Sequence, residues 1–216
     1  MGISRYATKP SRLGFVMILV LGTSVSAVAQ NRMPMIPEDQ MSSAQKKAVE
    51  EFKSARGQAT LTGPWTVLVR VPELLTLGRM WRDHVQNRTV IGNKLTELVI
   101  LITAREWTQQ YEWNAHQQAA IKAGLKAEIV QAIAEGRRPE RMLEDEEIVY
   151  DFCTELQRNR SVSDATYART RAKIGEEGIV EAASIQGFYA LLAMTMNVAR
   201  TPLAAGAQPP LLLLPR

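Results

Sequence analysis

An isolated carboxylate lies within a long apolar run in Leu95–Gly124, LTELVILITAREWTQQYEWNAHQQAAIKAG. Glu97 comes directly before five successive aliphatic residues, 98–102. Burying an ionised carboxylate is costly unless the group is paired or hydrogen-bonded. A second carboxylate, Glu112, lies four residues before His116, so these two side chains share one face of a helix. The Glu/His pair is the best explanation for Glu97, and the three residues form the candidate site.

A single straight helix cannot bring these residues together. Glu97 and His116 are 19 residues apart, which corresponds to about 28 Å along a helix axis. A break near residues 107–109, with Thr108 as the N-cap, would fold the segment into a helical hairpin. Glu97 and His116 would then lie at similar depth on facing helices. No glycine or proline forces this break, so the hairpin remains a prediction.

The rest of the chain is also typical of helices. Apolar residues recur at three and four in Ser43–Ala55 and again after Pro64, with a kink or fresh start expected at Pro72. Gly92 is expected to turn the chain and Asn93 to cap the central helix. The later predicted helices are Lys126–Ala134, Glu144–Arg158, Asp164–Ile174 (capped by Ser163) and Ile179–Ala199. With no alternating run and no hairpin dipeptide, the predicted fold class is all-α.

The first 29 residues are typical of a secretory signal peptide. Arg5, Lys9 and Arg12 precede an apolar run, 13–22, and Ala27–Ala29 supplies a cleavage site. The apolar run is too short for a bilayer, which needs about 20 residues. We therefore expect an exported protein, periplasmic or secreted, with no membrane attachment after cleavage; an uncleaved anchor is the alternative.

Removing that segment changes the charge of the chain. The 216-residue sequence has a net charge of +4, but residues 1–29 hold three basic and no acidic residues. The remaining 187 residues carry 23 basic and 22 acidic residues, a net charge of +1. A basic surface for nucleic acid is therefore not expected.

The mature chain has the length of one domain. Residues 30–60 are predicted to form a tether and a first helix, 61–203 the main domain, and 204–216 a Pro/Leu-rich tail. The four leucines of the tail are expected either to be exposed or to dock onto a neighbouring subunit.

Three other polar residues favour ordinary roles. Cys153, the only cysteine, cannot form an intramolecular disulfide and is expected to be a small hydrophobe on a helix face, with a reactive thiol as the alternative. His84 lies among charged residues and is expected to be exposed, and Glu106 is expected to be a solvated charge.

The order of several motifs resembles the carboxymuconolactone decarboxylase family, which shares its all-helical fold with alkylhydroperoxidase D. The likeness is carried by Leu95–Leu101, Tyr111–His116 and Ala123–Leu125, and it extends over roughly residues 60–203. The peroxidase branch of the family carries a Cys-x-x-Cys-x-x-x-His element. Gln109 and Glu112 stand at the matching positions here, so both thiols are missing. The resemblance therefore implies the cysteine-free branch, an alkylhydroperoxidase D-like bundle built around the helical hairpin.

The family's site, carried over, gives Glu97, Glu112 and His116 as catalytic residues. His116 can exchange protons near neutral pH, and Glu112 is expected to orient it. Glu97, if burial raises its pKa, would donate or relay a proton. No cofactor is implied, and no metal is expected because catalytic metal sites usually use more histidine ligands.

The predicted substrate is a small carboxylated lactone or related organic acid. Arg70, Arg105 and Arg138 are candidates for binding its carboxylate. Tyr111 and Trp113 are candidates for stacking on the substrate, with core or interface positions as the alternative. A non-catalytic scaffold or binding protein is the second functional hypothesis, and a peroxidase-type antioxidant protein is disfavoured. The resemblance implies a homo-oligomer, a trimer or hexamer.

Overall fold

The computed structural model describes residues 1–2, 30–203 and 206–214. These residues form helices and no strand, which confirms the all-α fold class. The elements are a 3-10 turn, η1 (Glu38–Gln40), and eight helices, α1 (Ser43–Arg56), α2 (Trp65–Leu68), α3 (Pro72–Asn87), α4 (Gly92–Glu106), α5 (Gln110–Lys122), α6 (Ala127–Ala134), α7 (Glu144–Asn159) and α8 (Asp164–Ala199). The predicted signal peptide lies outside the described residues, apart from its first two.

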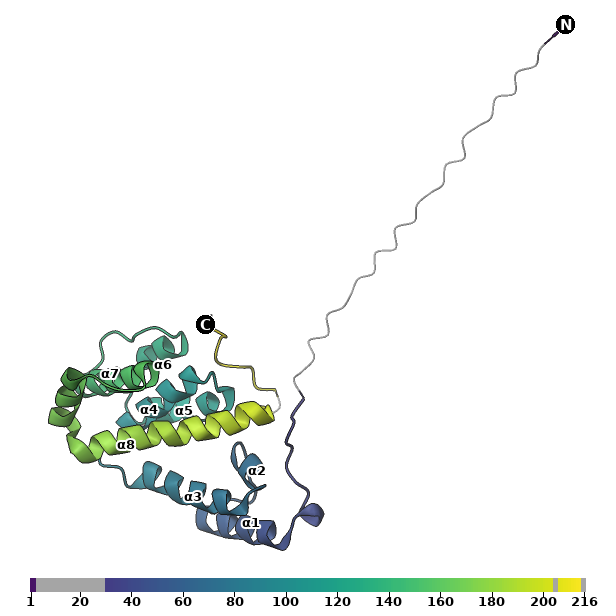
Figure 1. The fold of residues 1–216 in the computed structure, drawn as a ribbon, viewed down its shortest axis with the longest axis horizontal. Helices are drawn as coiled ribbons and strands as arrows, with labels where there is room; N and C mark the ends of the chain where they lie inside the picture. The colour runs from purple at the N-terminus through teal and green to yellow at the C-terminus, as the bar shows by residue number, and fades with distance from the viewer. Residues whose placement is uncertain (3–29, 204–205, 215–216) are drawn as a thin grey trace.

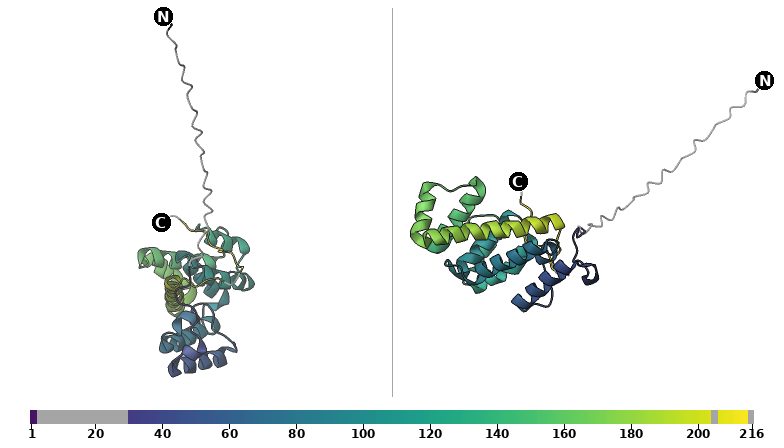
Figure 2. Two further views of the ribbon diagram at one scale, coloured as in Figure 1. Left: turned by 90° about the vertical axis from the view of Figure 1, so that its right-hand side faces the viewer. Right: turned by 60° about the horizontal axis from the view of Figure 1, so that its bottom comes forward.

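Helix α8 crosses the molecule between two groups of helices (Figure 1). Helices α1 to α3 lie on one side of it and α4 to α7 on the other, as the view nearly along α8 also shows (Figure 2, left). Helix α4 packs against α5, α6, α7 and α8. It is consequently enclosed, and all of its residues 95–105 are buried.

The predicted break between α4 and α5 is present. Helix α4 ends at Glu106, and Thr108 takes a left-handed backbone conformation with a φ of 47°. The predicted N-cap was wrong: Gln109 caps α5, because its side-chain oxygen accepts hydrogen bonds from the backbone N–H groups of Tyr111 (2.6 Å) and Glu112 (3.3 Å). Gln109 Nε2 also donates to Asn197 Oδ1 at 3.0 Å, which links the corner to the end of α8.

The starts of three other helices can be compared with the sequence. Pro72 begins α3 in the first helical turn, where its missing N–H costs nothing. Ser163 caps α8 by accepting from the Thr166 N–H, as predicted. Asn93 is not an N-cap, because α4 already begins at Gly92.

Helix α8 is bent at Gly175, which has a φ of 71° and a ψ of 177°. The predicted separation of two helical segments is therefore confirmed, although Gly178 lies inside the second segment. Among the described residues, α8 is the one helix long and apolar enough to span a membrane by length and composition, and half of its most apolar window is buried. It packs against α2, α3, α4 and α7.

The described part of the C-terminal tail lies against its own chain, an outcome that the sequence analysis did not anticipate. Leu211 is buried and exchanges two hydrogen bonds with the side chain of Gln110. The Arg105 guanidinium donates to the carbonyl of Leu212. Leu212 and Leu213 remain exposed. The tail therefore covers the α4–α5 corner.

Candidate functional site

Glu97 and His116 meet across the α4–α5 hairpin. Glu97 Oε2 lies 2.8 Å from His116 Nδ1, and the side chains are 8% and 17% exposed. An ionised carboxylate accepts a hydrogen bond, so the pairing places the proton of Nδ1 between the two groups. Glu97 thus fixes the tautomer and orientation of the ring, and Nε2 is the nitrogen left for chemistry.

The pairing explains the unusual carboxylate in the apolar run. Because α4 packs against five helices, the side chain of Glu97 is only 8% exposed to water. It is stabilised by a partner from α5. The expectation that Glu97 and His116 lie at similar depth on facing helices is confirmed.

Glu112 is buried without a partner. It is 3% exposed, and neither carboxyl oxygen has a hydrogen-bond partner among the described residues. Loss of solvation raises the pKa of Glu112 well above its ordinary value. The sequence analysis assigned the orienting role to Glu112 and the raised pKa to Glu97. The contacts show that these two roles belong to the opposite residues. Glu97 orients His116, and Glu112 is the carboxyl group whose protonated form is favoured.

Tyr189 of α8 is a site residue that the sequence analysis missed. Its ring meets the His116 ring edge to face, with 5.2 Å between the centroids. Gln86 Nε2 donates to the Tyr189 hydroxyl at 3.3 Å. Burial, and then the charges of Glu97 and Glu112, raise the pKa of this phenol, so the hydroxyl keeps its proton. Its position within the apolar stretch of α8 gave no signal beyond that of an ordinary core aromatic.

The three arginines predicted to bind substrate have other partners. Arg138 forms ion pairs with Glu147 and Asp151 of α7. Arg70 donates to the carbonyls of Thr66 and Pro34, which holds the N-terminal segment against α2. Arg105 is buried and donates to the carbonyls of Ala134 and Leu212. It also lies eight residues after Glu97, about 12 Å along α4. The hydrogen bonds of Arg70 and Arg105 therefore hold both guanidinium groups away from His116.

The two predicted stacking aromatics differ from each other. Trp113 is 1% exposed and belongs to the core, the alternative position that the sequence analysis left open. Tyr111 is partly buried and its ring covers Gly63, where an added Cβ would lie 2.3 Å from the ring. Tyr111 therefore joins α5 to the chain before α2.

A second histidine–carboxylate pair lies beyond the site. His84 Nε2 is 3.1 Å from Glu181 Oε1, and Glu181 also accepts from the Val90 N–H and the Thr89 hydroxyl. The His84 side chain is 45% exposed, as expected, but it has a partner that the sequence did not indicate. The pair joins the loop before α4 to α8.

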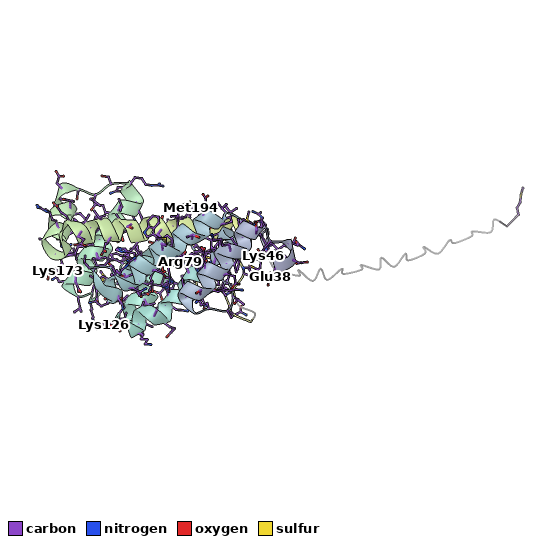
Figure 3. The ribbon with its side chains drawn as sticks, turned by 90° about the horizontal axis from the view of Figure 1, so that it is seen from below. Glu38, Lys46, Arg79, Lys126, Lys173 and Met194 are labelled. Carbon is purple, nitrogen blue, oxygen red and sulfur yellow. The ribbon has the colours of Figure 1, made fainter. Side chains whose placement is uncertain are left out.

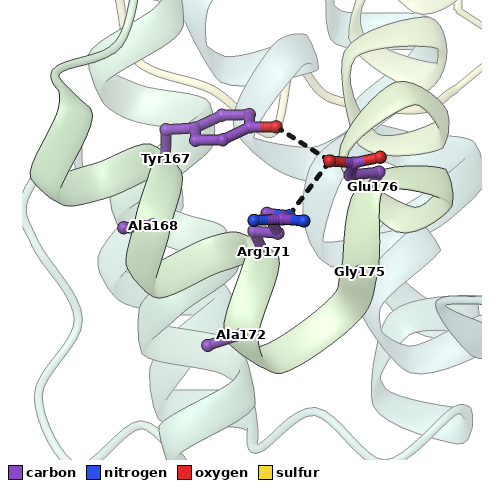
Figure 4. Close-up of a pocket in the computed structure, with 6 residues that line it drawn as sticks. All are labelled: Tyr167, Ala168, Arg171, Ala172, Gly175 and Glu176. Atoms are coloured by element: carbon purple, nitrogen blue, oxygen red, sulfur yellow. Dashed lines mark hydrogen bonds and ion pairs between the residues drawn. The ribbon is translucent and has the colours of Figure 1, made fainter.

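Two open cavities are lined by residues other than Glu97, Glu112 and His116. One, of about 580 Å³, is lined by residues of α8 around its bend, including Tyr167, Arg171 and Glu176 (Figure 4). The other, of about 520 Å³, lies between the same bend and the start of α4. Tyr189 is 13 residues after Glu176, about 20 Å along α8. These cavities are therefore not the candidate site.

The remaining predicted residues occupy ordinary positions. Glu106 is exposed, as expected. Cys153 is fully buried, and burial raises the pKa of its thiol, which removes the reactive alternative. Within the described residues, no three His, Cys, Asp or Glu side chains are grouped closely enough to hold a metal ion.

No family model matches the sequence, and no curated protein matches it significantly. Solved structures do match the fold. An uncharacterized peroxidase-related protein from Silicibacter sp. TM1040 gives a TM-score of 0.62 at 12% identity, covering 80% of this chain and 90% of that one. The debrominase Bmp8 in complex with 2,3,4-tribromopyrrole gives a TM-score of 0.62 at 14% identity. The match covers 82% of this chain and 92% of the debrominase chain.

A third solved structure, described as an alkylhydroperoxidase AhpD core and a peroxidase-related protein from Ralstonia eutropha JMP134, gives a TM-score of 0.62 at 14% identity. It covers 81% of this chain and 92% of that chain. At such identities a likeness shows the fold and not the chemistry. The chain has the all-helical fold of alkylhydroperoxidase D-like proteins.

Proposed function

We propose that this protein is an exported enzyme that decarboxylates a small carboxylated lactone or a related organic acid by proton transfer through Glu97, Glu112 and His116. One observation carries the proposal: a buried carboxyl group without partners lies one helical turn from a histidine oriented by a second carboxylate. Two acids in different surroundings, one hydrogen-bonded to a histidine and one buried without partners, are typical of acid–base catalysis.

The Glu97–His116 pair supplies a base. Glu97 accepts from Nδ1 and stabilises the imidazolium that forms when Nε2 takes a proton. The His116 side chain is partly exposed, so Nε2 can exchange that proton with solvent.

Glu112 supplies a proton to carbon. Decarboxylation breaks the bond between the carboxylate carbon and the ring, and CO₂ leaves without the electron pair. The pair moves into the conjugated carbonyl of the lactone, and Glu112 then protonates the carbon. Glu112 regains a proton by way of His116 on the same helix face. Atoms and charge balance without an oxidant.

Two further observations support this reaction class over peroxide reduction. Gln109 and Glu112 stand where the peroxidase branch has its two thiols, and Cys153 is buried and isolated. Thiol peroxidase chemistry needs an accessible thiolate and a resolving partner. The structural neighbour that holds a tribromopyrrole also supports a small ring compound as a ligand for this fold.

The same fold could instead serve a non-catalytic binding or scaffold protein. The two functions differ in what they require of Glu97. A scaffold would keep its properties with Glu97→Gln, which retains shape and hydrogen bonding. A catalyst would lose the stabilisation of the imidazolium.

The test is decarboxylation of carboxymuconolactone and related carboxylated butenolides in D₂O by the purified protein. We expect release of CO₂ and incorporation of one deuterium at the carbon that lost the carboxylate. Glu97→Gln, Glu112→Gln and His116→Gln should each slow both signals by at least about 100-fold, and His84→Gln is the matched control. Release of CO₂ at equal rates from all four variants would exclude the proposed site.

The export and assembly of the protein are proposals as well. The residues between 1 and 29 support export by their order of charge, apolar run and cleavage site. Exposed apolar side chains on α3 and α8 support a homo-oligomer, namely Leu77, Met80, Trp81, Val180, Met194 and Val198. Light scattering at two protein concentrations checks the assembly.

A further inference from the structure

The side chain of Tyr189 is held by contacts at its hydroxyl and at its ring. Gln86 of α3 donates to the hydroxyl at 3.3 Å. The neighbouring Phe188 ring meets the Tyr189 ring edge to face, with 5.4 Å between the centroids. Phe188 is itself stacked on Trp81 of α3 at 5.1 Å, and the indole nitrogen of Trp81 donates to Ser184 of α8 at 2.9 Å. These contacts restrict the rotation of the Tyr189 ring.

Tyr189 connects α3 with the α4–α5 hairpin. It lies on α8, which packs against both α3 and α4. Arg79 of α3 and Met194 of α8 mark these two helices in the view from below (Figure 3). The phenol that accepts from Gln86 has its ring 5.2 Å from the His116 ring, with the two planes at 90°. Through Tyr189, a helix that carries none of the candidate acids and bases is joined to the histidine.

The hydrogen bond to Glu97 does not by itself fix the His116 ring. The contact of Nδ1 with Glu97 Oε2 sets the tautomer and holds one atom of the ring. It leaves the ring free to tilt about the line that joins these two atoms. A second contact is needed to set the plane of the ring and hence the direction of Nε2. Among the described residues, Tyr189 supplies the aromatic ring that contacts His116.

We propose that Tyr189 is a positioning residue, whose ring sets the plane of the His116 imidazole and so directs Nε2 towards the substrate. This inference rests on the proposed function, in which Nε2 takes up a proton. Burial raises the pKa of the Tyr189 phenol, so the side chain stays neutral and acts on the histidine by packing. The hydroxyl serves to hold the ring, through Gln86.

The first experiment is nuclear magnetic resonance of the full chain, which contains two histidines, His84 and His116. The signals are assigned with His84→Gln. In wild type we expect nuclear Overhauser contacts between the ring protons of His116 and Tyr189. In Tyr189→Leu the His116 signals should broaden, because the ring then samples more than one plane, while the His84 signals stay unchanged. The proton should remain on Nδ1 of His116, since Glu97 is still present.

Steady-state kinetics separate the ring of Tyr189 from its hydroxyl. Tyr189→Leu removes the ring and should lower kcat for carboxymuconolactone about 10- to 100-fold with KM nearly unchanged, because a misplaced catalytic group acts on the reacting complex. Tyr189→Phe keeps the ring and should retain most of the activity and the sharp His116 signals. Equal losses in these two variants would overturn the role of the ring.

Tyr150→Leu is the matched control. Tyr150 is a buried tyrosine of α7, and its ring lies 5.5 Å from the Arg138 guanidinium. Its substitution removes the same atoms as Tyr189→Leu and should leave kcat and the His116 signals unchanged. Similar changes in the two leucine variants would reduce the effect to general packing and overturn the proposal.

A second variant covers failure of Tyr189→Leu to fold, which circular dichroism detects. Tyr189→Met fills the same space with a flexible chain and no ring, and should give the same broadening and the same loss of kcat. Sharp His116 signals in a folded variant without the ring would overturn the proposal. So would the absence of Overhauser contacts between Tyr189 and His116 in wild type.

The outcome can be separated from that of the catalytic proposal. Broadened His116 signals in Tyr189→Leu, together with no decarboxylation by wild type, would support the positioning role and refute the proposed reaction. Decarboxylation by wild type with an unchanged kcat in Tyr189→Leu would refute the positioning role and leave the reaction in place.

Discussion

Two histidine–glutamate pairs of this protein have nearly the same contact and different surroundings. The pair of His116 and Glu97 has 2.8 Å between nitrogen and oxygen, and the pair of His84 and Glu181 has 3.1 Å. Glu181 accepts two further hydrogen bonds from the loop before α4, and its histidine is nearly half exposed. Glu97 has His116 as its one side-chain partner among the described residues, and that histidine is mostly buried.

The difference shows that a histidine–carboxylate contact alone does not indicate a catalytic site. At Glu181 the carboxylate is satisfied by two segments of the chain, which it holds together. At Glu97 the contact is directed at one ring, and an unpartnered acid and a buried phenol lie next to it. The neighbours distinguish the structural pair from the candidate catalytic pair.

The largest expected effect comes from removing the two histidines in turn. His116→Gln should lower the rate of decarboxylation by about 10²- to 10⁴-fold, the usual contribution of a general acid or base. His84→Gln should leave it within about twofold, since this ring pairs with Glu181 and not with a residue of the site. Steady-state rates measured on carboxymuconolactone check both. Equal losses in the two variants would mean that the pairs do not differ in role.

Glu112→Gln should change how stability depends on pH. The folded-state pKa of Glu112 is raised, so wild type is most stable below the ordinary pKa of a glutamate and loses stability as pH rises towards the folded value. A neutral glutamine does not titrate. The variant should therefore be more stable than wild type at neutral pH, by about 1–3 kcal/mol, and no more stable in acid. Urea unfolding at several pH values measures the difference; a constant difference would contradict it.

Glu181→Ala should lower stability and spare catalysis. The substitution leaves the Val90 N–H and the Thr89 hydroxyl without their acceptor, which costs about 1–2 kcal/mol. Glu97→Gln, the corresponding substitution in the inner pair, should lower the rate of decarboxylation and leave stability nearly unchanged. Chemical denaturation measures the stability of the two variants, and decarboxylation rates measure their activity. A large loss of activity in Glu181→Ala would show that the outer pair also acts on the site.

The smallest effect is expected at the corner of the hairpin. Gln109→Ala removes the cap of α5 and the contact with Asn197, and should destabilise the protein by about 1 kcal/mol. Gln109→Asn keeps the amide with a shorter reach and should lose less. Thermal unfolding monitored by circular dichroism measures both. No change in either variant would contradict the role of Gln109 as cap.

The hairpin was predictable from the sequence because one residue required it. Glu97 in an apolar run needs a partner, and His116 could reach it after a break near residue 108. The bend at Gly175 was predictable as well, since glycine adopts positive φ readily. These features depend on neighbours in sequence or on one strong energetic conflict.

Other parts of the site depend on contacts that no local pattern carries. In the sequence, Tyr189 has the pattern of a core residue in an apolar helix. Its contact with the His116 ring depends on how α8 packs against the hairpin. The roles of Glu97 and Glu112 were exchanged because helical spacing pairs residue 112 with 116, whereas the ring faces α4.

Infrared difference spectroscopy of wild type and Glu112→Gln at neutral pH tests most directly whether a buried acid keeps its proton beside the oriented histidine. We expect wild type to show the C=O stretch of a protonated carboxyl group, shifted in D₂O and missing from Glu112→Gln. Glu181→Gln should retain this band. A difference spectrum that contains only carboxylate bands would show that Glu112 is ionised, and it could not then be the proton donor.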